Sequence, residues 1–267
     1  MMNVEMKKLD NEQLKKQFLE ELKENIAQCL YLTIDLEMYG LNDPKVNFYY
    51  DLYQGRLNTL IMKYYDSVQI FSPNDNWNGS IYVDFIRGLD PIAICGKKQM
   101  IEQLRPFMQE YYSEYGIVVA DNRYREFPQF KLVRQAIPQD AKKIAELMFS
   151  TEEFSQNNSL DMLEKQLFDR MRNGIGRSFV IEEDGMIVAH TAIYAECGNA
   201  AVESGLVVHD EYVKKFYGLI IHEYIKKVLT EEKKTLYGLR YNETMQNSAR
   251  KEDLDVRAEC GRLIKRR

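Results

Sequence analysis

Two adjacent lysines and a glycine carry the clearest chemical signal in this sequence. Lys214 and Lys215 follow an apolar, strand-like run, and Gly218 lies at the start of the amphipathic stretch YGLIIHEYIKKVL. The first turn of a helix has free backbone N–H groups that favour anions, and glycine allows a ligand to approach the backbone closely. Lysines beside a helix start more often form a solvated face. The segment therefore predicts either a phosphate site or an ordinary basic surface.

Other common kinds of catalytic site have no counterpart in the sequence. His190, His209 and His222 have no motif-like nucleophile near them, so neither a Ser-His-Asp nor a Cys-His arrangement is indicated. We expect His190 to be a partly buried histidine with satisfied hydrogen bonds. The four cysteines are far apart and form no C-x-x-C pair, which predicts neither a metal site nor a disulfide framework. Walker and G-x-G-x-x-G motifs are also missing.

The size and composition of the chain indicate two soluble domains. The chain has 267 residues, and its contents of 45% hydrophobic and 29% charged residues are ordinary for a folded protein. A net charge of −5 argues against a general nucleic-acid binder, so small molecules or proteins are the expected partners. No apolar run approaches about 18 residues, and the charged start is not a signal peptide, so no membrane span is expected. With the cysteine usage, this predicts a cytoplasmic protein.

The first half of the chain reads as a helix followed by strands. Residues 11–38 repeat apolar side chains every four positions, which predicts one helix that ends at Gly40. The runs VNFYYDLY and RLNTLIMKYYDSVQIF flank Gln54-Gly55, as in a hairpin or meander. KKQMIEQLRPFMQEY is then helical in spacing and precedes a short strand, GIVVADN. This half is rich in tyrosine, which suits a substrate cleft or a subunit interface.

The second half repeats this order of elements. Two helical stretches, AIPQDAKKIAELMFS and SLDMLEKQLFDRM, precede a hairpin at Asp184-Gly185, a third strand, the helix YGLIIHEYIKKVL and the strand TLYGLRYN. We infer two related α/β units in tandem, with divergent duplication as a hypothesis based on element order. The polar, aromatic stretch ADNRYREFPQF contains Pro128 and is the expected junction, which divides the chain into domains 1–128 and 129–267.

Four segments of the second domain resemble the GNAT superfamily of acyl-CoA-dependent N-acetyltransferases. They are, in order, FKLVRQAIPQDAKKIAELM, SFVIEEDGMIVAHTAIY, AAVESGLVVHDEY and YGLIIHEYIKKVL. The ordered combination covers about half the chain and is more specific than any one segment. The resemblance implies an α/β fold with a mixed central sheet flanked by helices, and it makes the first domain a diverged GNAT-like unit.

The resemblance also implies acetyl-CoA as co-substrate. In the family the pyrophosphate loop reads roughly R-G-x-G-x-G, whereas here only the last glycine remains, and side chains at Lys214 and Phe216 are expected to crowd the approach. The backbone of the preceding strand would pair with the pantetheine arm like an added strand, with core side chains there, and an asparagine follows the next strand. The implied cofactor-binding residues are Leu206, Val207, Val208, Val213, Lys214, Lys215, Phe216, Tyr217, Gly218 and Asn242.

Catalysis in this family needs a base for the amine and an acid for the leaving thiolate. The tyrosine that usually serves as acid is replaced by Ala249. The substitutes are Glu203 as base and Tyr241 as acid, with Tyr237 as a further candidate. Strand alternation places Glu203 on the same face as Val207. The alternatives are a strand-edge Glu203 that faces solvent and tyrosines that only pack.

The sequence thus predicts an N-acetyltransferase that acts on a primary amine of a small metabolite. Its rival is a catalytically silent tandem GNAT scaffold that binds a ligand or partner protein, which the eroded loop and Ala249 favour. A different nucleotide or acyl carrier in the cleft is a third reading. The first domain is expected to border the acceptor, and a homodimer is left open.

Overall fold

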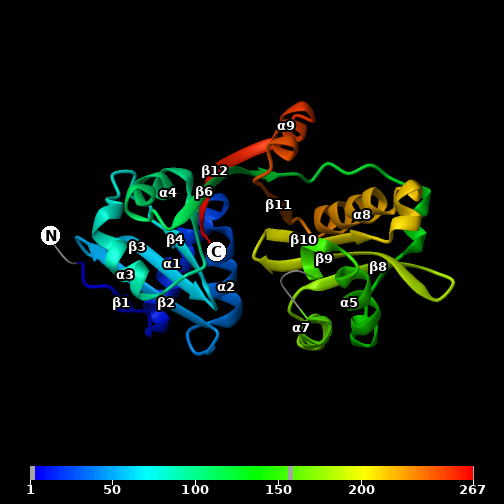
Figure 1. Cartoon of the computed structure of the whole chain (residues 1–267), viewed down its shortest axis with the longest axis horizontal. Helices are drawn as coiled ribbons and strands as arrows, with labels where there is room; N and C mark the ends of the chain where they lie inside the picture. The colour runs from blue at the N-terminus through cyan, green and yellow to red at the C-terminus, as the bar shows by residue number, and fades with distance from the viewer. Residues whose placement is uncertain (1–3, 156–158, 267) are drawn as a thin grey trace. The chain divides into compact units, whose positions relative to one another are not determined.

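The computed structural model describes residues 4–155 and 159–266, which form two compact units. Unit 1 comprises Met1–Ala120 with Leu239–Arg267, and unit 2 comprises Asp121–Gly238. Each unit has its own hydrophobic cores and its own strands (Figure 1). None of the described helices is both long and apolar enough to span a membrane.

Unit 1 is a mixed sheet with helices packed against it. Its strands lie in the order β1-β2-β3-β4-β5-β12-β6. Neighbours from β1 to β4 are antiparallel, β4 and β5 are parallel, and β12 is antiparallel to both β5 and β6. The elements are β1 (Lys7–Lys8), α1 (Glu12–Glu24), η1 (Ile26–Gln28), α2 (Leu30–Tyr39), β2 (Val46–Tyr53), β3 (Arg56–Tyr64), β4 (Ser67–Phe71), η2 (Gly79–Tyr82), α3 (Val83–Gly88), β5 (Ala93–Lys97), α4 (Lys98–Leu104), η3 (Arg105–Phe107), β6 (Tyr111–Ala120), α9 (Glu243–Lys251) and β12 (Asp255–Lys265).

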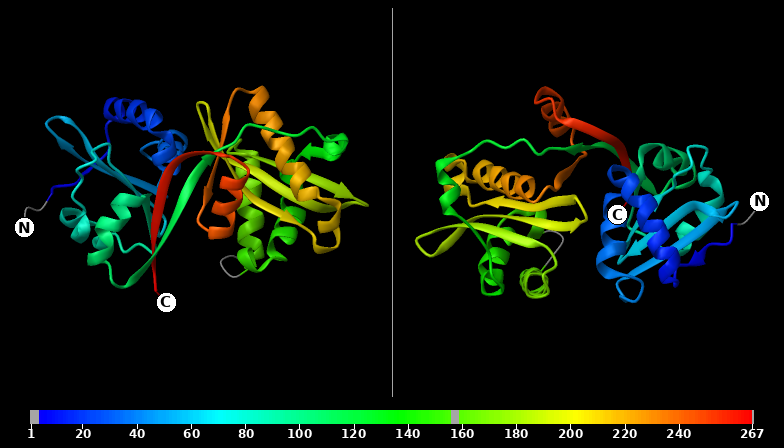
Figure 2. Two further views of the ribbon diagram at one scale, coloured as in Figure 1. Left: turned by 90° about the horizontal axis from the view of Figure 1, so that it is seen from above. Right: turned by 180° about the vertical axis from the view of Figure 1, so that it is seen from behind.

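The strand β12 completes unit 1, although it follows unit 2 in the sequence. It lies between β5 and β6 and pairs with both, and Figure 2 shows it beside β6. Its Leu263 is fully buried in the core of unit 1. The sequence-based division assigned these residues to domain 129–267. A truncation before Phe130 would remove both partners of β12, so it would test folding as well as any role of the first half at the acceptor.

Two helix boundaries in unit 1 differ from the sequence-based expectation. The helix expected over residues 11–38 is broken at Asn25, whose side-chain amide donates to the Glu21 carbonyl (3.0 Å). Gly40, with φ of 65°, follows α2 as predicted. Later, Pro106 lies in η3, and β6 begins at Tyr111, so the helix is shorter and the strand longer than expected.

A pair of stacked rings fills the segment that follows β4. The rings of Trp77 and Tyr82 lie 5.2 Å apart at an angle of 8°. The Tyr82 hydroxyl accepts from Thr59 (2.8 Å) and donates to Asp51 (3.1 Å), and Trp77 Nε1 donates to Thr59 (2.9 Å). Burial raises the pKa of Tyr82. β4 also pairs with β5 from Ser67 to Ile70, so the edge of β4 that faces β5 is paired along nearly its whole length.

The strands of unit 2 lie in the order β7-β8-β9-β10-β11. Its strands are antiparallel except for β10 and β11, which are parallel. Helices α5 and α7 pack on one face and α8 on the other (Figure 1). The elements are η4 (Pro128–Leu132), β7 (Val133–Gln135), η5 (Pro138–Asp140), α5 (Ala141–Phe149), α6 (Glu152–Ser155), α7 (Leu160–Arg172), β8 (Arg177–Glu183), β9 (Met186–Cys197), β10 (Ala200–Val208), η6 (Asp210–Lys215), α8 (Tyr217–Glu231) and β11 (Thr235–Arg240).

The predicted order of elements in the second half is confirmed, with α6 as an addition. The hairpin turn at Asp184 and Gly185 has φ of 49° and 79°, and two positive values are typical of the tight turn that joins twisted strands. The mixed α/β fold is also confirmed.

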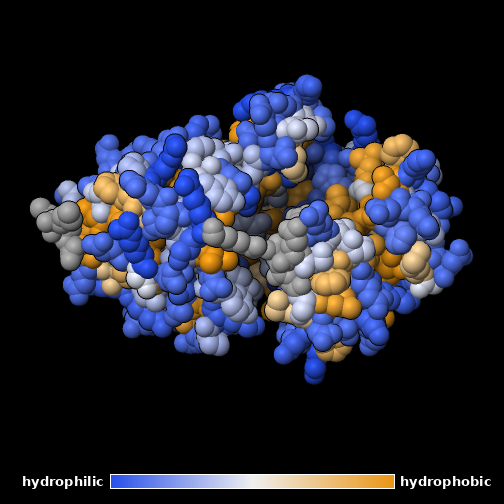
Figure 3. All heavy atoms as spheres, viewed as in Figure 1, coloured by the Kyte–Doolittle hydropathy of each residue, from blue (hydrophilic) through white to orange (hydrophobic). Residues whose placement is uncertain are grey.

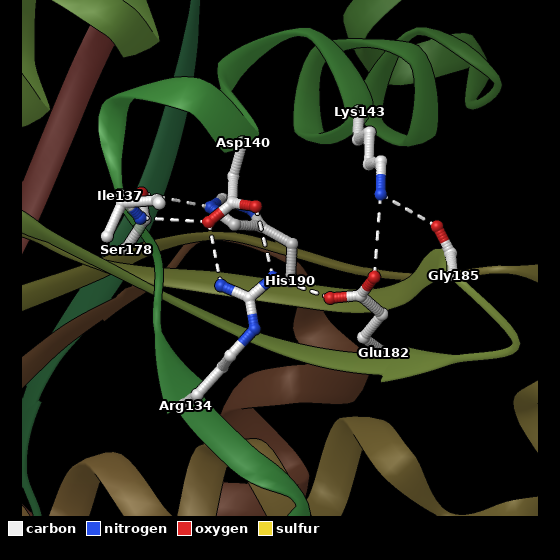
Figure 4. Close-up of polar contacts among 8 residues, drawn as sticks. All are labelled: Arg134, Ile137, Asp140, Lys143, Ser178, Glu182, Gly185 and His190. Carbon is white, nitrogen blue, oxygen red and sulfur yellow. Dashed lines mark hydrogen bonds and ion pairs between the residues drawn. The ribbon is translucent and has the colours of Figure 1, made fainter.

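An ion-pair network joins the first strand, the first helix and the hairpin of unit 2. Arg134 on β7 donates to both carboxylate oxygens of Asp140 (2.7 and 3.0 Å) and to Glu182 on β8 (2.6 Å). Lys143 on α5 donates to the Gly185 carbonyl (2.7 Å; Figure 4). The hydrogen bond from Arg134 lowers the pKa of Asp140. The network fixes the start of α5 against the sheet.

A buried ion pair holds the segment after Ala120 against α8. Lys226 contacts Glu223 (2.7 Å) and Asp121 (3.1 Å), and both partners on α8 are 5% exposed. The backbone N–H of Arg125 donates to Glu223 (2.6 Å). Buried charges need such partners, because removing one partner of a buried ion pair destabilises the folded state by roughly 3–5 kcal/mol. The contacts fix the position of α8 within unit 2.

We predict that Leu263→Ala destabilises unit 1 by about 2–5 kcal/mol, because it leaves a cavity where β12 enters the core. The single tryptophan, Trp77, lies in the same core, so its fluorescence during urea unfolding reports on unit 1. Ile221→Ala, in the core of unit 2, is the matched control and should change the tryptophan transition much less. An unchanged transition in Leu263→Ala would show that β12 does not stabilise unit 1.

Candidate functional site

Among the described residues, one edge of β10 is left without a strand partner beyond Val202. β10 pairs with β11 from Ala200 to Val202 and then continues to Val208 alone on that side. On its other side, β10 pairs with β9 through two register shifts, between Val202 and Glu203 and between Ser204 and Val207. Unpaired backbone groups on a strand edge can hydrogen-bond to an extended ligand. Residues 203–208 therefore offer a strand-like binding edge.

A buried histidine holds the second irregularity of β10. Gly205 has φ of 73°, in the region that favours glycine, and its carbonyl accepts a hydrogen bond from His190 Nδ1 (2.8 Å). A carbonyl only accepts, so Nδ1 carries the proton and Nε2 accepts from the Ser178 hydroxyl (3.2 Å; Figure 4). Burial lowers the pKa of His190 to about 4. The expected satisfied histidine is confirmed, and it is neutral at pH 7.

The three residues expected along the pantetheine arm point in different directions. Val207 is buried in the core on the α5 face, and Val208 packs against the core on the α8 face. Leu206 is 47% exposed, so the expectation that it is a core residue is wrong. The physical reason is the bulge, which turns Leu206 out of both cores.

The face occupied by Glu203 also differs from the expectation. Glu203 accepts from Thr191 Oγ1 (2.8 Å) on β9 and contacts His222 Nδ1 (2.5 Å) on α8. It therefore lies on the α8 face, whereas Val207 lies on the α5 face. Simple alternation would place both on one face, but the extra residues of the bulge reverse it.

Glu203 and His222 form a carboxylate–imidazole pair at the start of the unpaired edge. His222 is 25% exposed and Glu203 is 13% exposed at the side chain. Because Nδ1 faces the carboxylate, Nε2 is the nitrogen left for solvent or a ligand. An imidazole oriented in this way can accept a proton from a reacting group. The arrangement suits general acid–base chemistry.

Sequence reasoning did not find this pair. The sequence shows no motif-like partner near His222, because Glu203 is on another element. The available signal is its spacing: His222 is four residues after Gly218 and therefore lies on the same face of α8. Gly218 packs against β10, as an added Cβ there would come within 3.2 Å of Val208.

The segment expected to hold a pyrophosphate is partly a 3₁₀ helix. The N–H of Phe216 donates to the Val213 carbonyl (3.1 Å), and Phe216 itself has φ of 58°. Phe216 thus adopts the left-handed conformation that glycine usually supplies, at a cost of about 1–2 kcal/mol. Its side chain is 69% exposed, and that of Val213 is 56% exposed. No described side chain caps the start of α8, so its first N–H groups have no side-chain acceptor in the part of the chain that the structure describes.

The two lysines have different surroundings. Lys215 pairs with Glu183 (2.6 Å) and lies over the ring of Tyr212 (4.9 Å to the centroid). The hydroxyl of Tyr217 donates to the same carboxylate of Glu183. Lys214 is exposed. Lys214 is therefore the lysine that is better placed to meet an anion from solution.

Two of the predicted site residues belong to unit 1. The guanidinium carbon of Arg262 lies 4.2 Å from the centroid of the Tyr241 ring, and burial raises the pKa of Tyr241. The Asn242 side chain caps α9 by accepting from the N–H of Thr244 (2.8 Å). Ala249 is buried on α9. The roles of Tyr241 and Asn242 toward an acceptor or cofactor stay predictions.

A cavity of about 170 Å³ lies on the α5 and α7 face of unit 2. Its floor includes Ser178 and His190, together with Ser204 and Gly205 of the β10 bulge. The bulge residues Ser204 and Gly205 thus line the cavity on one face of the sheet and also form part of the unpaired strand edge. Glu203 and His222 lie on the opposite face, toward α8.

A scan of family models and a search of curated proteins found no match to this sequence. Solved structures do match. A Drosophila protein superposes with a TM-score of 0.67 at 11% identity and 98% coverage of both chains. A tandem GNAT protein from the clavulanic acid biosynthesis pathway matches with a TM-score of 0.59 at 12% identity, over 97% of both chains. The chain has a tandem GNAT fold.

A third structure agrees with this assignment. A GCN5-related N-acetyltransferase-like protein from Streptococcus suis matches this chain with a TM-score of 0.56 and 11% identity, over 96% of this chain and 100% of its own. The predicted resemblance and the predicted tandem arrangement are confirmed. At such low identity the likeness establishes the fold, while activity and acceptor are separate questions.

We predict that this tandem GNAT fold loses stability on mild acidification because of His190. Its pKa is about 4 in the folded state and ordinarily 6.5, so the unfolded state takes up the proton first as pH falls. The contribution is complete above pH 6.5 and decreases toward pH 4, by about 2 kcal/mol between pH 7 and pH 5. Urea unfolding monitored by circular dichroism at these pH values measures it. His190→Asn should flatten the dependence, and an equally steep decline in this variant would contradict the assignment.

Proposed function

We propose that unit 2 transfers an acetyl group from acetyl-CoA to a primary amine of a small metabolite. The observation that carries this proposal is the unpaired edge of β10, which begins at Glu203 and leads toward the uncapped start of α8. Acetyl-CoA supplies an activated acetyl thioester on an extended amide-containing arm that ends in a pyrophosphate. The chain offers a hydrogen-bonding edge for such an arm and free N–H groups for such an anion.

The residues that would hold the co-substrate follow from this arrangement. The backbone of Leu206, Val207 and Val208 would bond to the arm, and the first N–H groups of α8, at Tyr217 and Gly218, would meet the phosphates. Lys214 would add charge. The positive φ of Phe216 supports the fit, since the backbone there bends as it would with glycine and the ring is mostly in solvent.

The proposed proton acceptor is His222. Acetyl transfer requires the amine nitrogen to lose a proton as it bonds to the acetyl carbon and as the thiol leaves. His222 Nε2 would take that proton, and Glu203 would orient the ring and stabilise its charged form through Nδ1. This changes the predicted role of Glu203 from base to positioning residue.

A silent scaffold is the second candidate, and one observation favours it. Glu183 already neutralises Lys215 and accepts from the Tyr217 hydroxyl, so part of the loop is committed to internal contacts. A scaffold would bind a ligand in the same cleft without transfer. A different nucleotide or acyl carrier in place of acetyl-CoA is the third candidate.

Calorimetric titration of the full chain separates these candidates. We predict micromolar binding of acetyl-CoA and CoA, weakened about tenfold, or about 1.4 kcal/mol, by Lys214→Glu, because that charge would lie near the pyrophosphate. Lys142→Glu on the exposed side of α5 is the matched control and should leave affinity unchanged. No heat at millimolar acetyl-CoA and CoA would refute the proposal.

Steady-state acetylation of a small amine tests the proton acceptor. We predict that His222→Gln lowers kcat about 10²–10⁴-fold, because a general base is removed, while acetyl-CoA affinity stays near the wild-type value. Glu203→Gln should lower kcat by a smaller factor, because the imidazole remains but loses its orienting carboxylate. Glu231→Gln, on the exposed end of α8, is the control. Wild-type kcat in His222→Gln would rule out this role.

A further inference from the structure

The cavity on the α5 and α7 face has a lining that indicates a particular class of ligand. Its volume is about 170 Å³, and engineered apolar cavities of about 150 Å³ accommodate benzene. It can therefore receive a group the size of a phenyl ring or a branched aliphatic chain. Its apolar walls come mainly from the helices and from the segment before β8, and they include Met148, Phe154, Leu163, Leu167, Met171 and Ile175.

The helix α7, which supplies part of this apolar lining, also has hydrophobic side chains at the surface. Figure 3 shows a largely hydrophilic surface with exposed hydrophobic groups over the part of unit 2 that carries α7. On α7, Leu163 is buried, whereas Met162 and Phe168 are 44% and 38% exposed. The lining favours an apolar ligand group, as small-molecule pockets generally do, with a few polar groups to fix its orientation.

Arg170 is the polar group that stands out in this cavity. Its guanidinium lies over the ring of Tyr194 (3.9 Å to the centroid) and donates to the Tyr194 carbonyl. The other arginine in the lining, Arg177, is neutralised by Glu196 (3.1 Å) and Glu232 (2.5 Å). In contrast, Arg170 forms no ion pair with the side chains that the structure describes, which exclude those of Glu153 and of residues 156–158. Among the described side chains, the positive charge of Arg170 therefore has no acidic partner in this cavity.

The contacts of Arg170 leave most of its donors for a ligand. A guanidinium has five N–H donors, and the Tyr194 carbonyl uses one of its amino groups. Stacking on the ring fixes the plane of the guanidinium, which prepares it for a planar carboxylate. A partly buried cation without a counter-ion is also less stable than a paired one, so an anionic ligand has an energetic advantage here.

The third feature of the cavity is its floor at the β10 bulge. Ser204 and Gly205 line the cavity and also belong to the unpaired edge of β10. Under the proposed function, the acetyl group is delivered along this edge. An amine held in the cavity would therefore meet the acetyl group at the bulge.

We propose that the acceptor is an α-amino acid with an apolar side chain, an assignment that rests on the proposed function. The side chain occupies the apolar walls, the carboxylate binds Arg170 and the amino group faces Ser204 and Gly205. The neutral amine nitrogen bonds to the acetyl carbon as the carbon–sulfur bond breaks. The amine proton passes around the unpaired edge of β10 to His222 Nε2 on the α8 face, and a proton returns to the thiolate sulfur, so that CoA departs as the thiol. The product is an N-acetyl amino acid.

A matched set of acceptors tests this assignment in the full chain with acetyl-CoA. L-phenylalanine, its amide and 2-phenylethylamine share one apolar group, but only the first has a carboxylate. We expect kcat/KM for phenylalanine to exceed that for the other two by about 10–100-fold, the value of one charge-assisted interaction. Glycine should be acetylated about 10–100-fold more slowly than phenylalanine, because it leaves the apolar walls empty. Equal values for phenylalanine, its amide and 2-phenylethylamine overturn the proposal.

Variants of Arg170 separate a binding role from a folding role. Arg170→Gln should lower kcat/KM for phenylalanine about 10–100-fold and leave that for 2-phenylethylamine unchanged, and Arg170→Lys should restore part of the difference. A general loss of folding would lower both rates alike, and an equal loss for both acceptors counts against the proposal.

Direct binding distinguishes failure of this inference from failure of the proposed function. Calorimetric titration of the protein with L-phenylalanine alone does not depend on acetyl transfer. Binding in the millimolar range or tighter that is lost in Arg170→Gln supports the site even if acetyl-CoA does not bind. Absence of phenylalanine binding, in protein that binds acetyl-CoA, overturns this inference and leaves the proposed function in place.

Discussion

The hydrogen bond between His190 and the Gly205 carbonyl is the interaction on which the geometry of the candidate site depends. It fixes a bulge in β10 whose extra residues reverse the order of faces along the strand. Val207 consequently enters the core on the α5 face, and Glu203 meets His222 on the α8 face. Because the histidine is buried and neutral, it holds the carbonyl without placing a charge beneath the cavity.

The two units share an arrangement of strands but differ in how much of the parallel pair is hydrogen-bonded. Each has antiparallel strands followed by one parallel neighbour, β4 with β5 in unit 1 and β10 with β11 in unit 2. In unit 1 the parallel pair continues from Ser67 to Ile70, and the stacked Trp77 and Tyr82 fill the next segment. In unit 2 the pairing stops at Val202. The potential for chemistry therefore follows from where a ladder ends, not from the order of elements.

Much of the fold could be predicted from the sequence, because it depends on local signals. Apolar spacing, the turn at Asp184-Gly185 and the glycine after α2 mark elements through their own residues. The site was less accessible. The face of the sheet on which Glu203 lies depends on a bulge that the sequence periodicity does not reveal. His222 can be recognised as a candidate only from its contact with Glu203, 19 residues earlier and on another element. The position of β12 depends on pairing with strands more than a hundred residues away in sequence, which local patterns cannot specify.

That position of β12 has a consequence for synthesis on the ribosome. The facing edges of β5 and β6 stay without their central partner until the whole of unit 2 has been translated. At about 5–20 residues per second, this interval is roughly 7–30 s. Unit 2 has its full set of strands as soon as β11 emerges. The half of the protein that is made first is therefore the half that finishes folding last, and during this interval the edges of β5 and β6 are open to pairing with other strands.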